Sequence, residues 1–344
     1  MTVARTTALS DTGRKRRHNE DTFVLQPPVF AVVDGMGGAK AGEVASALAA
    51  EALREEPHDG GSGEEVVVSL IQEANRRVYQ RAAEDASTTG MGTTLTVAVV
   101  EDERVRFGHV GDSRAYLVRN GELIQLTEDH SLVGELVRSG KLAPEDAETH
   151  PQRSVITRAL GTDPDVDVDT FTQEARSGDI FLLCSDGLYS MVGDTTILEL
   201  LERNRGDLDA AARALVAAAN RAGGDDNITV VAFEIAAPGE ETIRLPAAGS
   251  AAGSPQPEEE DTLTEADAVP AVSSRVIGPE EVEELAAKQQ RDRVAEPAPE
   301  PAVAPIDRGD AEEQRDRRLP RRALVTALLA AAIVAAVVIY LLSR

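Results

Sequence analysis

The stretch FAVVDGMGGAKAGEVAS (residues 30–46) decides how the chain can be interpreted, because an apolar run ends there at Asp34-Gly35 and a glycine-rich turn follows. Two explanations compete for a carboxylate at the end of a buried strand. Asp and Gly are the usual residues of a tight strand-to-helix turn. Glycine also lets the backbone approach a bound ion or phosphate closely. Taken alone, the stretch leaves both open, and turns are the more common explanation.

The composition narrows the classes of function that the chain can have. Its 344 residues include 60 Asp and Glu against 35 Lys and Arg, a formal net charge of −25. Such an acidic chain repels the phosphate backbone, so nucleic-acid binding is not expected. Tryptophan is absent and aromatic residues make up 3% of the chain, which argues against stacking platforms for sugars or bases. The single cysteine, Cys184, excludes an internal disulfide bond.

Residues 1–236 have the pattern of one globular unit. Runs rich in Val, Ile, Phe and Thr predict strands, and these runs are 29–35, 92–101, 104–120, 179–187 and 227–236. Apolar residues at helical spacing predict helices over 40–56, 63–84, 194–204 and 208–223. Asn120-Gly121 between two strand-like flanks predicts a hairpin. Since strands and helices do not alternate regularly, the pattern favours an α+β layered fold over a doubly wound parallel sheet.

The composition changes after residue 236. Eleven of the 17 prolines lie in residues 237–322, together with acidic runs, and such a segment cannot bury enough apolar surface to become ordered. We therefore predict a disordered linker there, with a transient helix over 278–296. An uncharged run of 20 residues, 323–342, follows five arginines in 315–322. The run is long enough to span a bilayer as a helix, and the arginines predict a single-pass protein with its main domain in the cytoplasm, at the inner membrane.

Acidic residues gather at the ends of the strand-like runs. Asp-Gly recurs at Asp186-Gly187, another run ends in Gly111-Asp112, and acidic pairs stand at Glu20-Asp21 and Asp225-Asp226. If these strands share a sheet system, their ends can converge on one cleft. Crowded carboxylates are tolerated when cations neutralise them. Because no Cys or His cluster lies nearby, all-oxygen ligation suits Mg²⁺ or Mn²⁺, and a pair of such ions can activate a bridging water.

The basic segment 14–17 precedes Glu20-Asp21. An arginine there could clamp phosphate oxygens with its planar fork, and a solvated basic loop is the alternative. Cys184 does not fit a cysteine phosphatase, because Ser190 stands six positions later, where that class needs an arginine. A small buried hydrophobic side chain is the simpler interpretation of Cys184.

Six motifs together resemble the metal-dependent protein phosphatases of the PPM, or type 2C, family. They follow the order and spacing of that family and cover residues 5–235. The motifs are RxxNED (16–21), DGMGG (34–38), GMGTTLT (90–96), GDSR (111–114), SDGL (185–188) and Asp226-Asn227. Two further stretches, TEDHS (127–131) and HPQRSVITRALG (150–161), are similar to the bacterial branch of the family.

The resemblance implies a four-layer α/β/β/α sandwich with two central antiparallel sheets and a metal site at one end. It implies two Mn²⁺ or Mg²⁺ ions, with Asp34 bridging them, and a weaker third ion. The implied ligands of the pair are Asp34, the Gly35 carbonyl, Asp186 and Asp226. Those of the third ion are Asp112 and Asp186. Asp225 lies outside the family's Asp-Asn pair, so Asp226 is preferred to it.

The resemblance also implies roles for residues that do not bind the ions directly. Glu20 and Asp21 would hold metal-bound waters, with Glu20 the nearer of the two, and Arg16 would bind the substrate phosphate. Residues 131–160 would form a mobile flap beside the site. Animal members carry a histidine directly after the Asp-Gly pair as a leaving-group acid, but this chain has Met36 there. The general acid is therefore open, between a metal-bound water and another group.

The expected function is hydrolysis of phosphoserine and phosphothreonine on proteins. The resemblance suggests Ser/Thr kinases and their targets as partners, and the apolar run adds the lipid bilayer. The alternative is a catalytically silent member that serves as a membrane-tethered binding module. Such members usually lose a metal carboxylate, whereas every matching acid is present here, so catalysis is favoured.

Overall fold

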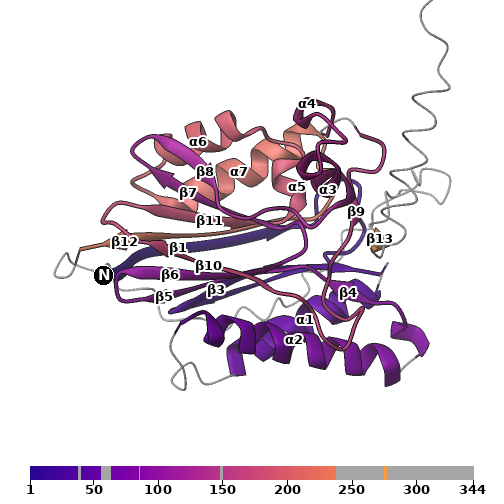
Figure 1. Ribbon diagram of the computed structural model, residues 1–344. Helices are drawn as coiled ribbons and strands as arrows, with labels where there is room; N and C mark the ends of the chain where they lie inside the picture. The colour runs from indigo at the N-terminus through magenta and orange to yellow at the C-terminus, as the bar shows by residue number, and fades with distance from the viewer. Residues whose placement is uncertain (38–39, 56–62, 85, 148–149, 238–274, 277–344) are drawn as a thin grey trace, which may run out of the picture. The chain divides into compact units, whose positions relative to one another are not determined.

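The computed structural model describes residues 1–37, 40–55, 63–84, 86–147, 150–237 and 275–276. Two antiparallel sheets pack face to face within it (Figure 1). The first has the strand order β1 (Thr2–Asp11), β12 (Ile228–Ala236), β11 (Ile180–Cys184), β7 (Arg114–Arg119) and β8 (Glu122–Gln125). The second has the order β10 (Asp169–Glu174), β6 (Arg104–Val110), β5 (Leu95–Glu101), β3 (Val29–Met36) and β2 (Asp21–Gln26), and β4 (Gly92–Thr93) pairs with β3.

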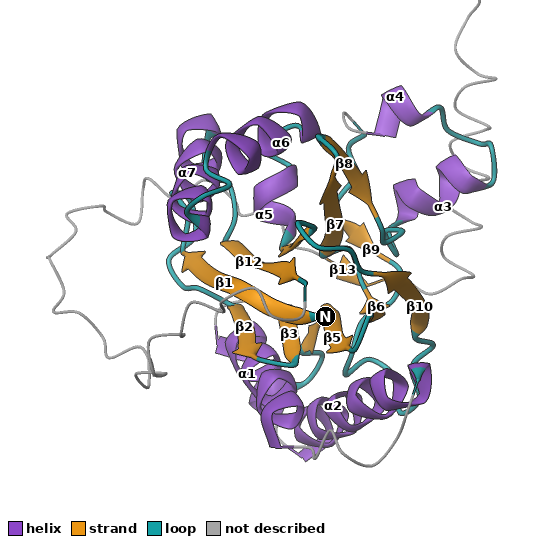
Figure 2. Cartoon of the chain, turned by 90° about the vertical axis from the view of Figure 1, so that its left-hand side faces the viewer, coloured by secondary structure: helices purple, strands orange, loops and turns teal. Residues whose placement is uncertain are grey.

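Helices cover the outer face of each sheet, as the end view in Figure 2 shows. The second sheet carries α1 (Lys40–Glu55) and α2 (Glu64–Glu84). The first carries α5 (Asp186–Tyr189), α6 (Asp194–Arg203) and α7 (Leu208–Ala222). A short 3₁₀ helix, η1 (Ala86–Thr88), follows α2. The expected α+β sandwich of two antiparallel sheets between helices is therefore confirmed.

Alternation of side chains along the strands produces three apolar layers, because successive residues of a strand point to opposite faces. In β3, Val29, Ala31 and Val33 pack toward α1 and α2, whereas Phe30 and Val32 face the other sheet. In β11, the even-numbered residues of Ile180–Cys184 pack toward the helices of the first sheet, and the odd-numbered ones face inward.

Stacked phenylalanines join the two sheets at their centre. Phe233 of β12 stacks on Phe30 of β3 with ring centroids 4.2 Å apart, and on Phe181 of β11 at 5.1 Å. All three side chains are fully buried. Removing a buried phenylalanine ring typically costs about 3–5 kcal/mol, so this stack holds the sheets in a fixed relation and fixes the relative position of the strand ends.

The expected helices and the hairpin are confirmed. Asn120 and Gly121 both have positive φ (55° and 78°), as the tight turn between β7 and β8 requires. Cys184 is buried in the apolar layer under the helices, and burial raises the pKa of its thiol to about 12. It therefore behaves as the small hydrophobic side chain that the sequence indicates.

Three expected strands are shorter than their apolar runs. The run 104–120 is divided by a turn at Gly111, which has φ +111°. The run 92–101 is interrupted at Thr94, and 179–187 leaves the sheet after Cys184, where α5 begins at Asp186. Each interruption places polar backbone or a carboxylate at the same end of the sandwich. Strands β1, β2 and β10 lack a long apolar run and were not predicted.

The segment 131–160 contains α3 (Leu132–Arg138), α4 (Pro144–Ala147) and β9 (Val155–Ile156). The Ser131 hydroxyl accepts a hydrogen bond from the Gly134 amide (3.1 Å) and caps α3. Within the expected linker the structure describes only β13 (Arg275–Val276), which pairs in parallel with β9. The predicted transient helix and the apolar run 323–342 lie outside the described residues. None of the described helices is long and apolar enough to cross a membrane.

Candidate functional site

The acidic residues singled out from the sequence lie at one end of the sandwich. Asp34 of β3 pairs in register with Asp21 of β2. Its carbonyl oxygen accepts hydrogen bonds from the Thr94 amide and the Thr93 hydroxyl (both 2.8 Å). Leu95 is in register with Val110, so the Gly111-Asp112 turn lies at the same edge. The second sheet therefore brings Asp21, Asp34 and Asp112 together.

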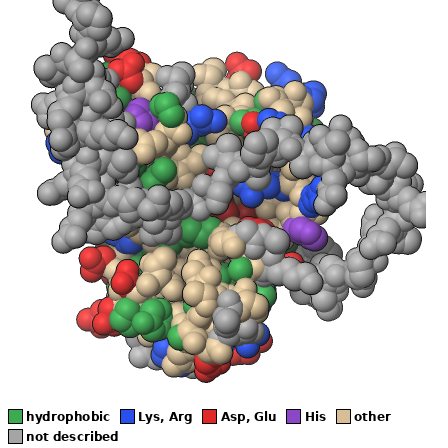
Figure 3. Space-filling view, turned by 90° about the vertical axis from the view of Figure 1, so that its right-hand side faces the viewer, with side chains coloured by type: hydrophobic (Ala, Val, Ile, Leu, Met, Phe, Trp, Pro, Cys, Tyr) green, Lys and Arg blue, Asp and Glu red, His purple; other side chains and the backbone are tan. Residues whose placement is uncertain are grey.

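The first sheet adds acids to the same end through two polar side chains. The Ser185 hydroxyl donates to Oδ2 of Asp21 (2.8 Å) and accepts from the Thr229 amide (2.9 Å), which ties the turn before Asp186 to the other sheet. The Asn227 side chain accepts from the Glu20 amide (2.8 Å). Asp226 and Glu20 are thereby held on facing turns. Figure 3 views this end, where acidic and basic side chains lie next to each other.

Burial and repulsion between neighbouring carboxylates raise the pKa of Asp34, Asp186 and Asp112 in this cluster. Burial, and then the charges of Asp21 and Asp186, raise the pKa of Asp34 well above its usual range. Burial and Asp226 do the same for Asp186. Asp112 reaches a pKa of about 7 through burial and the charge of Asp129. Asp34 and Asp186 keep some solvent exposure. The acids thus form one electrostatic unit that a positive ligand would stabilise.

Glu20 and Asp21, the acidic pair before and at the start of β2, are both 8% exposed. Burial, opposed in part by Arg16, raises the pKa of Glu20 to about 7. Burial raises the pKa of Asp21 to about 6 even though Thr229 and Ser185 hydrogen-bond to it. Oδ1 of Asp21 is buried and has no hydrogen-bond partner among the described residues. An acceptor oxygen left in that state indicates that a donor or a cation belongs beside it.

The basic segment contributes one arginine to the cluster. Nη2 of Arg16 donates to Oδ2 of Asp226 (2.6 Å), and both side chains are partly buried. Lys15 pairs with Asp225 (2.8 Å), where both side chains are exposed. The structure thus separates the two neighbouring acids, with Asp226 facing the cluster and Asp225 at the surface. Arg16 lies inside the site, not in a solvated loop.

The carboxylates are close enough to couple, yet each is also held by protein groups. Across the described residues, no three His, Cys, Asp or Glu side chains are already arranged as a metal site. Arg16 neutralises Asp226, and Ser185 binds Asp21. The donor set nevertheless fits hard divalent cations, because it consists of oxygen atoms, carries a large excess of negative charge and includes the unpaired Oδ1 of Asp21.

Glycine provides the close backbone approach at Gly35, which the sequence left open. A Cβ atom built on Gly35 would lie 2.2 Å from the carbonyl oxygen of Gly42 and 2.6 Å from that of Glu20. No other residue fits there without a shift of the backbone. The Gly35 amide donates to the Glu20 carbonyl (3.2 Å). The glycine after Asp34 therefore allows β3, the start of α1 and the Glu20 turn to meet at the cluster.

Met36, His130 and His150 lie in different surroundings. Met36 packs with Ile156 and Ala159 of the segment 131–160, so it contacts the expected flap. His130 is 4% exposed, and its Nδ1 accepts a hydrogen bond from the Gly111 amide (3.0 Å). His150 accepts from the Gln152 amide (3.1 Å). These contacts do not identify a general acid.

The family model described as Protein phosphatase 2C matches residues 14–225. This chain belongs to the protein phosphatase 2C family. It is therefore an enzyme, a protein-serine/threonine phosphatase, and the alternative of a silent binding module is not supported. Serine/threonine phosphatase stp of Listeria monocytogenes is 42% identical over 236 residues, 65% of this chain and 93% of stp. Protein phosphatase PstP of Mycobacterium tuberculosis is 42% identical over 235 residues, 68% of this chain but 45% of PstP.

Solved structures agree with this assignment. The crystal structure of the M. tuberculosis phosphatase PstP/Ppp is 41% identical, with a TM-score of 0.65, and the match covers 69% of this chain and all of that one. The PstP catalytic domain, solved in complex with two manganese ions, is 39% identical, with a TM-score of 0.63, and the match covers 68% of this chain. The division of the chain at residue 236 stays a prediction.

Sequence reasoning missed the residues that hold the acids in place. Ser185 and Asn227 stand inside the SDGL and Asp-Asn motifs, but only the acids of those motifs were predicted to be site residues. The Tyr189 hydroxyl, which donates to the Asp112 carbonyl (3.1 Å), was also missed. Ser185 and Asn227 could have been found, because a polar residue next to a buried acid usually hydrogen-bonds to its surroundings. Nothing in the sequence points to Tyr189.

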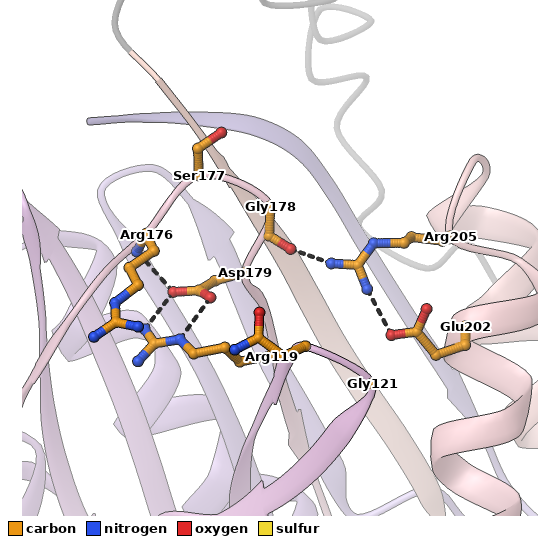
Figure 4. A pocket seen from close by; sticks show the side chains of 9 residues that line it. Arg119, Gly121, Arg176, Ser177, Gly178, Asp179, Glu202 and Arg205 are labelled. Atoms are coloured by element: carbon orange, nitrogen blue, oxygen red, sulfur yellow. Dashed lines mark hydrogen bonds and ion pairs between the residues drawn. The ribbon is translucent and has the colours of Figure 1, made fainter.

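A cavity of about 340 Å³ lies at the other end of the first sheet, where β11 begins (Figure 4). Three arginines line it, but two already have acidic partners. Arg119 binds Asp179 (2.5 and 2.9 Å) and Arg205 binds Glu202 (2.7 Å). The cavity therefore lacks the clustered carboxylates of the phosphatase site and takes no part in it.

The raised pKa of Glu20 predicts how the stability of the metal-free phosphatase depends on pH. Between about pH 4.5 and 7 the folded protein keeps a proton on Glu20 that the unfolded chain has lost. The contribution of Glu20 to the free energy of unfolding is therefore fully present below about pH 4.5, and it is lost as the pH rises through 7. The expected loss is roughly 3 kcal/mol for a shift of this size.

Urea denaturation of the chelator-treated protein from pH 4.5 to 8 measures this dependence. Glu20→Gln removes the titrating group, so the difference in unfolding free energy between the two proteins should change with pH in that window. Glu51→Gln, in an exposed position of α1, is the matched control. Parallel stability curves for the wild type and Glu20→Gln would contradict the prediction.

Proposed function

We propose that the phosphatase hydrolyses phosphoserine and phosphothreonine esters of proteins at a centre of two Mn²⁺ or Mg²⁺ ions. The observation that carries this proposal is the group of buried carboxylates whose charges raise one another's pKa at one end of the sandwich. The two manganese ions of the PstP catalytic domain support the choice of metal. When bound, such a pair lowers the pKa of a shared water and makes it a nucleophile toward phosphorus.

Each acid of the cluster has a separate role in holding the ions in this proposal. Asp34 would hold both ions of the pair, and the Gly35 carbonyl, Asp186 and Asp226 would complete the protein ligands. Asp112, together with Asp186, would hold a third and weaker ion. Glu20 and Asp21 would accept hydrogen bonds from water beside the ions. Cations beside these groups would favour their ionised forms and reverse the raised pKa values of the metal-free protein.

Arg16 orients the substrate phosphate. Its guanidinium now serves as the counter-charge to Asp226. A cation on Asp226 would take over that role, and the planar fork of Arg16 could then bind phosphate oxygens in a bidentate way. A metal ion would thus replace the Arg16 guanidinium as the partner of the Asp226 carboxylate. Arg16 would then be available to the substrate phosphate.

Turnover of a phosphothreonine peptide by the full chain, with and without Mn²⁺, tests the proposal. We expect activity that depends on Mn²⁺ and that chelator abolishes. Arg16→Ala should lower kcat/KM by about 10- to 100-fold, because charge-assisted hydrogen bonds contribute about 1.5–3 kcal/mol. Arg17→Ala, its exposed neighbour, is the control. Equal turnover with and without the metal would exclude the proposed centre.

We also propose that residues 323–342 anchor the enzyme to the cytoplasmic face of the membrane, with residues 237–322 as a flexible linker. The run of 20 uncharged residues and the arginines before it support this. Its substrates would then be phosphoproteins made by Ser/Thr kinases near the membrane, and some of those kinases themselves.

Cell fractionation tests the anchor. The full chain should sediment with membranes and resist extraction by carbonate. Ile333→Arg with Val334→Arg should release it, because each arginine at the centre of a spanning helix costs about 2.5–3.5 kcal/mol. Ser250→Arg with Ala251→Arg adds the same charge within the linker and should not release it. A wild-type chain found wholly in the supernatant would refute the anchor.

A further inference from the structure

His130 connects the Gly111-Asp112 turn, here called the metal-site turn, to the flap, residues 131–160, through its backbone and both ring nitrogens. Its backbone amide donates to the Gly111 carbonyl (2.7 Å), and its ring Nδ1 accepts from the Gly111 amide (3.0 Å). One residue thus holds both polar groups of Gly111, directly before Asp112. The His130 carbonyl accepts from the Thr157 amide (2.9 Å), where the flap returns to the sheet.

The opposite edge of the ring reaches the base of the flap. Nε2 of His130 lies 3.0 Å from Oδ2 of Asp169, the first residue of β10. Nη1 of Arg158, two residues after β9 in the flap, donates to Oδ1 of Asp169 (2.5 Å). The ring and Arg158 therefore share one carboxylate, and this carboxylate joins the flap to the sheet beside His130.

The contacts define the tautomer of the ring. Since the Gly111 amide can only donate, Nδ1 must be the unprotonated nitrogen. The neutral ring then carries its proton on Nε2, which donates to Asp169, and Nη1 of Arg158 lies 3.1 Å from the same nitrogen. Burial lowers the pKa of His130, consistent with a neutral ring. The two nitrogens thus have different partners. Nδ1 binds the backbone of the metal-site turn at Gly111, and Nε2 binds Asp169 at the base of the flap.

The turn that His130 holds has little freedom to move in other ways. Gly111 has φ +111°, and a Cβ built on it would lie 2.4 Å from Cβ of Thr94. The Asp112 carbonyl accepts from the Tyr189 hydroxyl. A displacement of His130 would therefore be transmitted to the backbone of Gly111-Asp112.

We propose that His130 is a positioning residue that couples the seating of the flap to the affinity of the Asp112 carboxylate for its cation. The inference rests on the proposed function, which assigns Asp112 to the third ion. Coupling of this kind is reciprocal. A seated flap strengthens binding of that ion, and the ion protects the flap to the same degree.

Two substitutions separate the duties of the ring. In His130→Asn, the amide oxygen stands near the position of Nδ1 and can accept from Gly111, but nothing reaches Asp169. In His130→Gln, the terminal amide reaches toward Asp169, but no acceptor remains for the Gly111 amide. His150→Asn changes a histidine within the flap, whose ring accepts from the Gln152 amide, and is the control.

Calorimetric titration of the full chain with Mn²⁺ and hydrogen exchange of flap peptides, each with and without Mn²⁺, provide the readouts. In the wild type, Mn²⁺ at the concentration that fills the weakest site should slow exchange in the flap. His130→Gln should weaken that site about tenfold, because it leaves the Gly111 amide unsatisfied. His130→Asn keeps an acceptor for Gly111, so it should lose only the affinity that a seated flap adds and weaken that site less than His130→Gln does, and its flap should exchange fast with or without Mn²⁺.

The outcomes separate the inference from its rivals. If both His130 variants lose the same amount of Mn²⁺ affinity, flap protection and melting temperature, His130 is merely structural and the inference is wrong. If both match the wild type and His150→Asn, it is also wrong. If the wild type binds no Mn²⁺, the proposed function fails. The exchange of the metal-free variants still tests the two contacts, because Gln should then expose residues 108–114 and Asn should expose the flap.

Discussion

Asp34→Asn should reduce Mn²⁺-dependent hydrolysis of a phosphopeptide by at least about a thousandfold. Metal ions contribute several kcal/mol to such reactions, and each 1.4 kcal/mol is tenfold in rate. The same variant should make the metal-free protein more stable, because Asp34 is repelled by Asp21 and Asp186 and its pKa is raised well above the usual range. A loss of activity with a gain in stability is a combination that misfolding cannot produce.

The control for this variant is Asp165→Asn, an exposed acid away from the cluster. It should change neither the rate nor the melting temperature. The measurements are initial rates with saturating Mn²⁺ and thermal unfolding after chelation. An Asp34→Asn protein with rates within tenfold of the wild type would show that Asp34 does not hold the ions.

Gly35→Ala should both destabilise the fold and remove activity. The new methyl group would meet the Gly42 carbonyl oxygen at 2.2 Å and the Glu20 carbonyl oxygen at 2.6 Å. These atoms belong to the backbone of α1 and of the turn before β2, so they cannot rotate away as a side chain would. Overpacking costs about 1–3 kcal/mol where side chains can move, and we expect at least about 3 kcal/mol here.

A loss of that size lowers the melting temperature by about 6–12 °C in a domain of this length. Gly206→Ala is the matched control, because a Cβ at Gly206 has no atom within 4 Å. Calorimetry and a Mn²⁺ titration of both variants give the comparison. If Gly35→Ala melts within about 2 °C of the wild type, less than a third of the smallest expected shift, and binds Mn²⁺ normally, the close approach at Gly35 is not needed.

Much of the fold could be predicted because its signals are local. The apolar spacing of 40–56 and 208–223 specifies helices regardless of their neighbours, and Asn120-Gly121 specifies its turn through its own backbone preferences. The limits of the strands were harder to predict. The run 104–120 is apolar on both sides of Gly111-Asp112, so the sequence left open whether one strand ends there or continues through it.

The sequence by itself singled out the acids that the structure places at one end of the sandwich, since Asp34, Asp112 and Asp186 each follow an apolar run within a motif and Asp226 precedes one. Only the tertiary structure decided what holds them. Ser185 contacts Asp21 across 164 positions of the chain, and Arg16 contacts Asp226 across 210. Such contacts depend on how two sheets pack, and no local pattern encodes that packing. The contacts of His130 are not encoded locally for the same reason, because its partners at Gly111 and Asp169 meet it only once the sheet has formed.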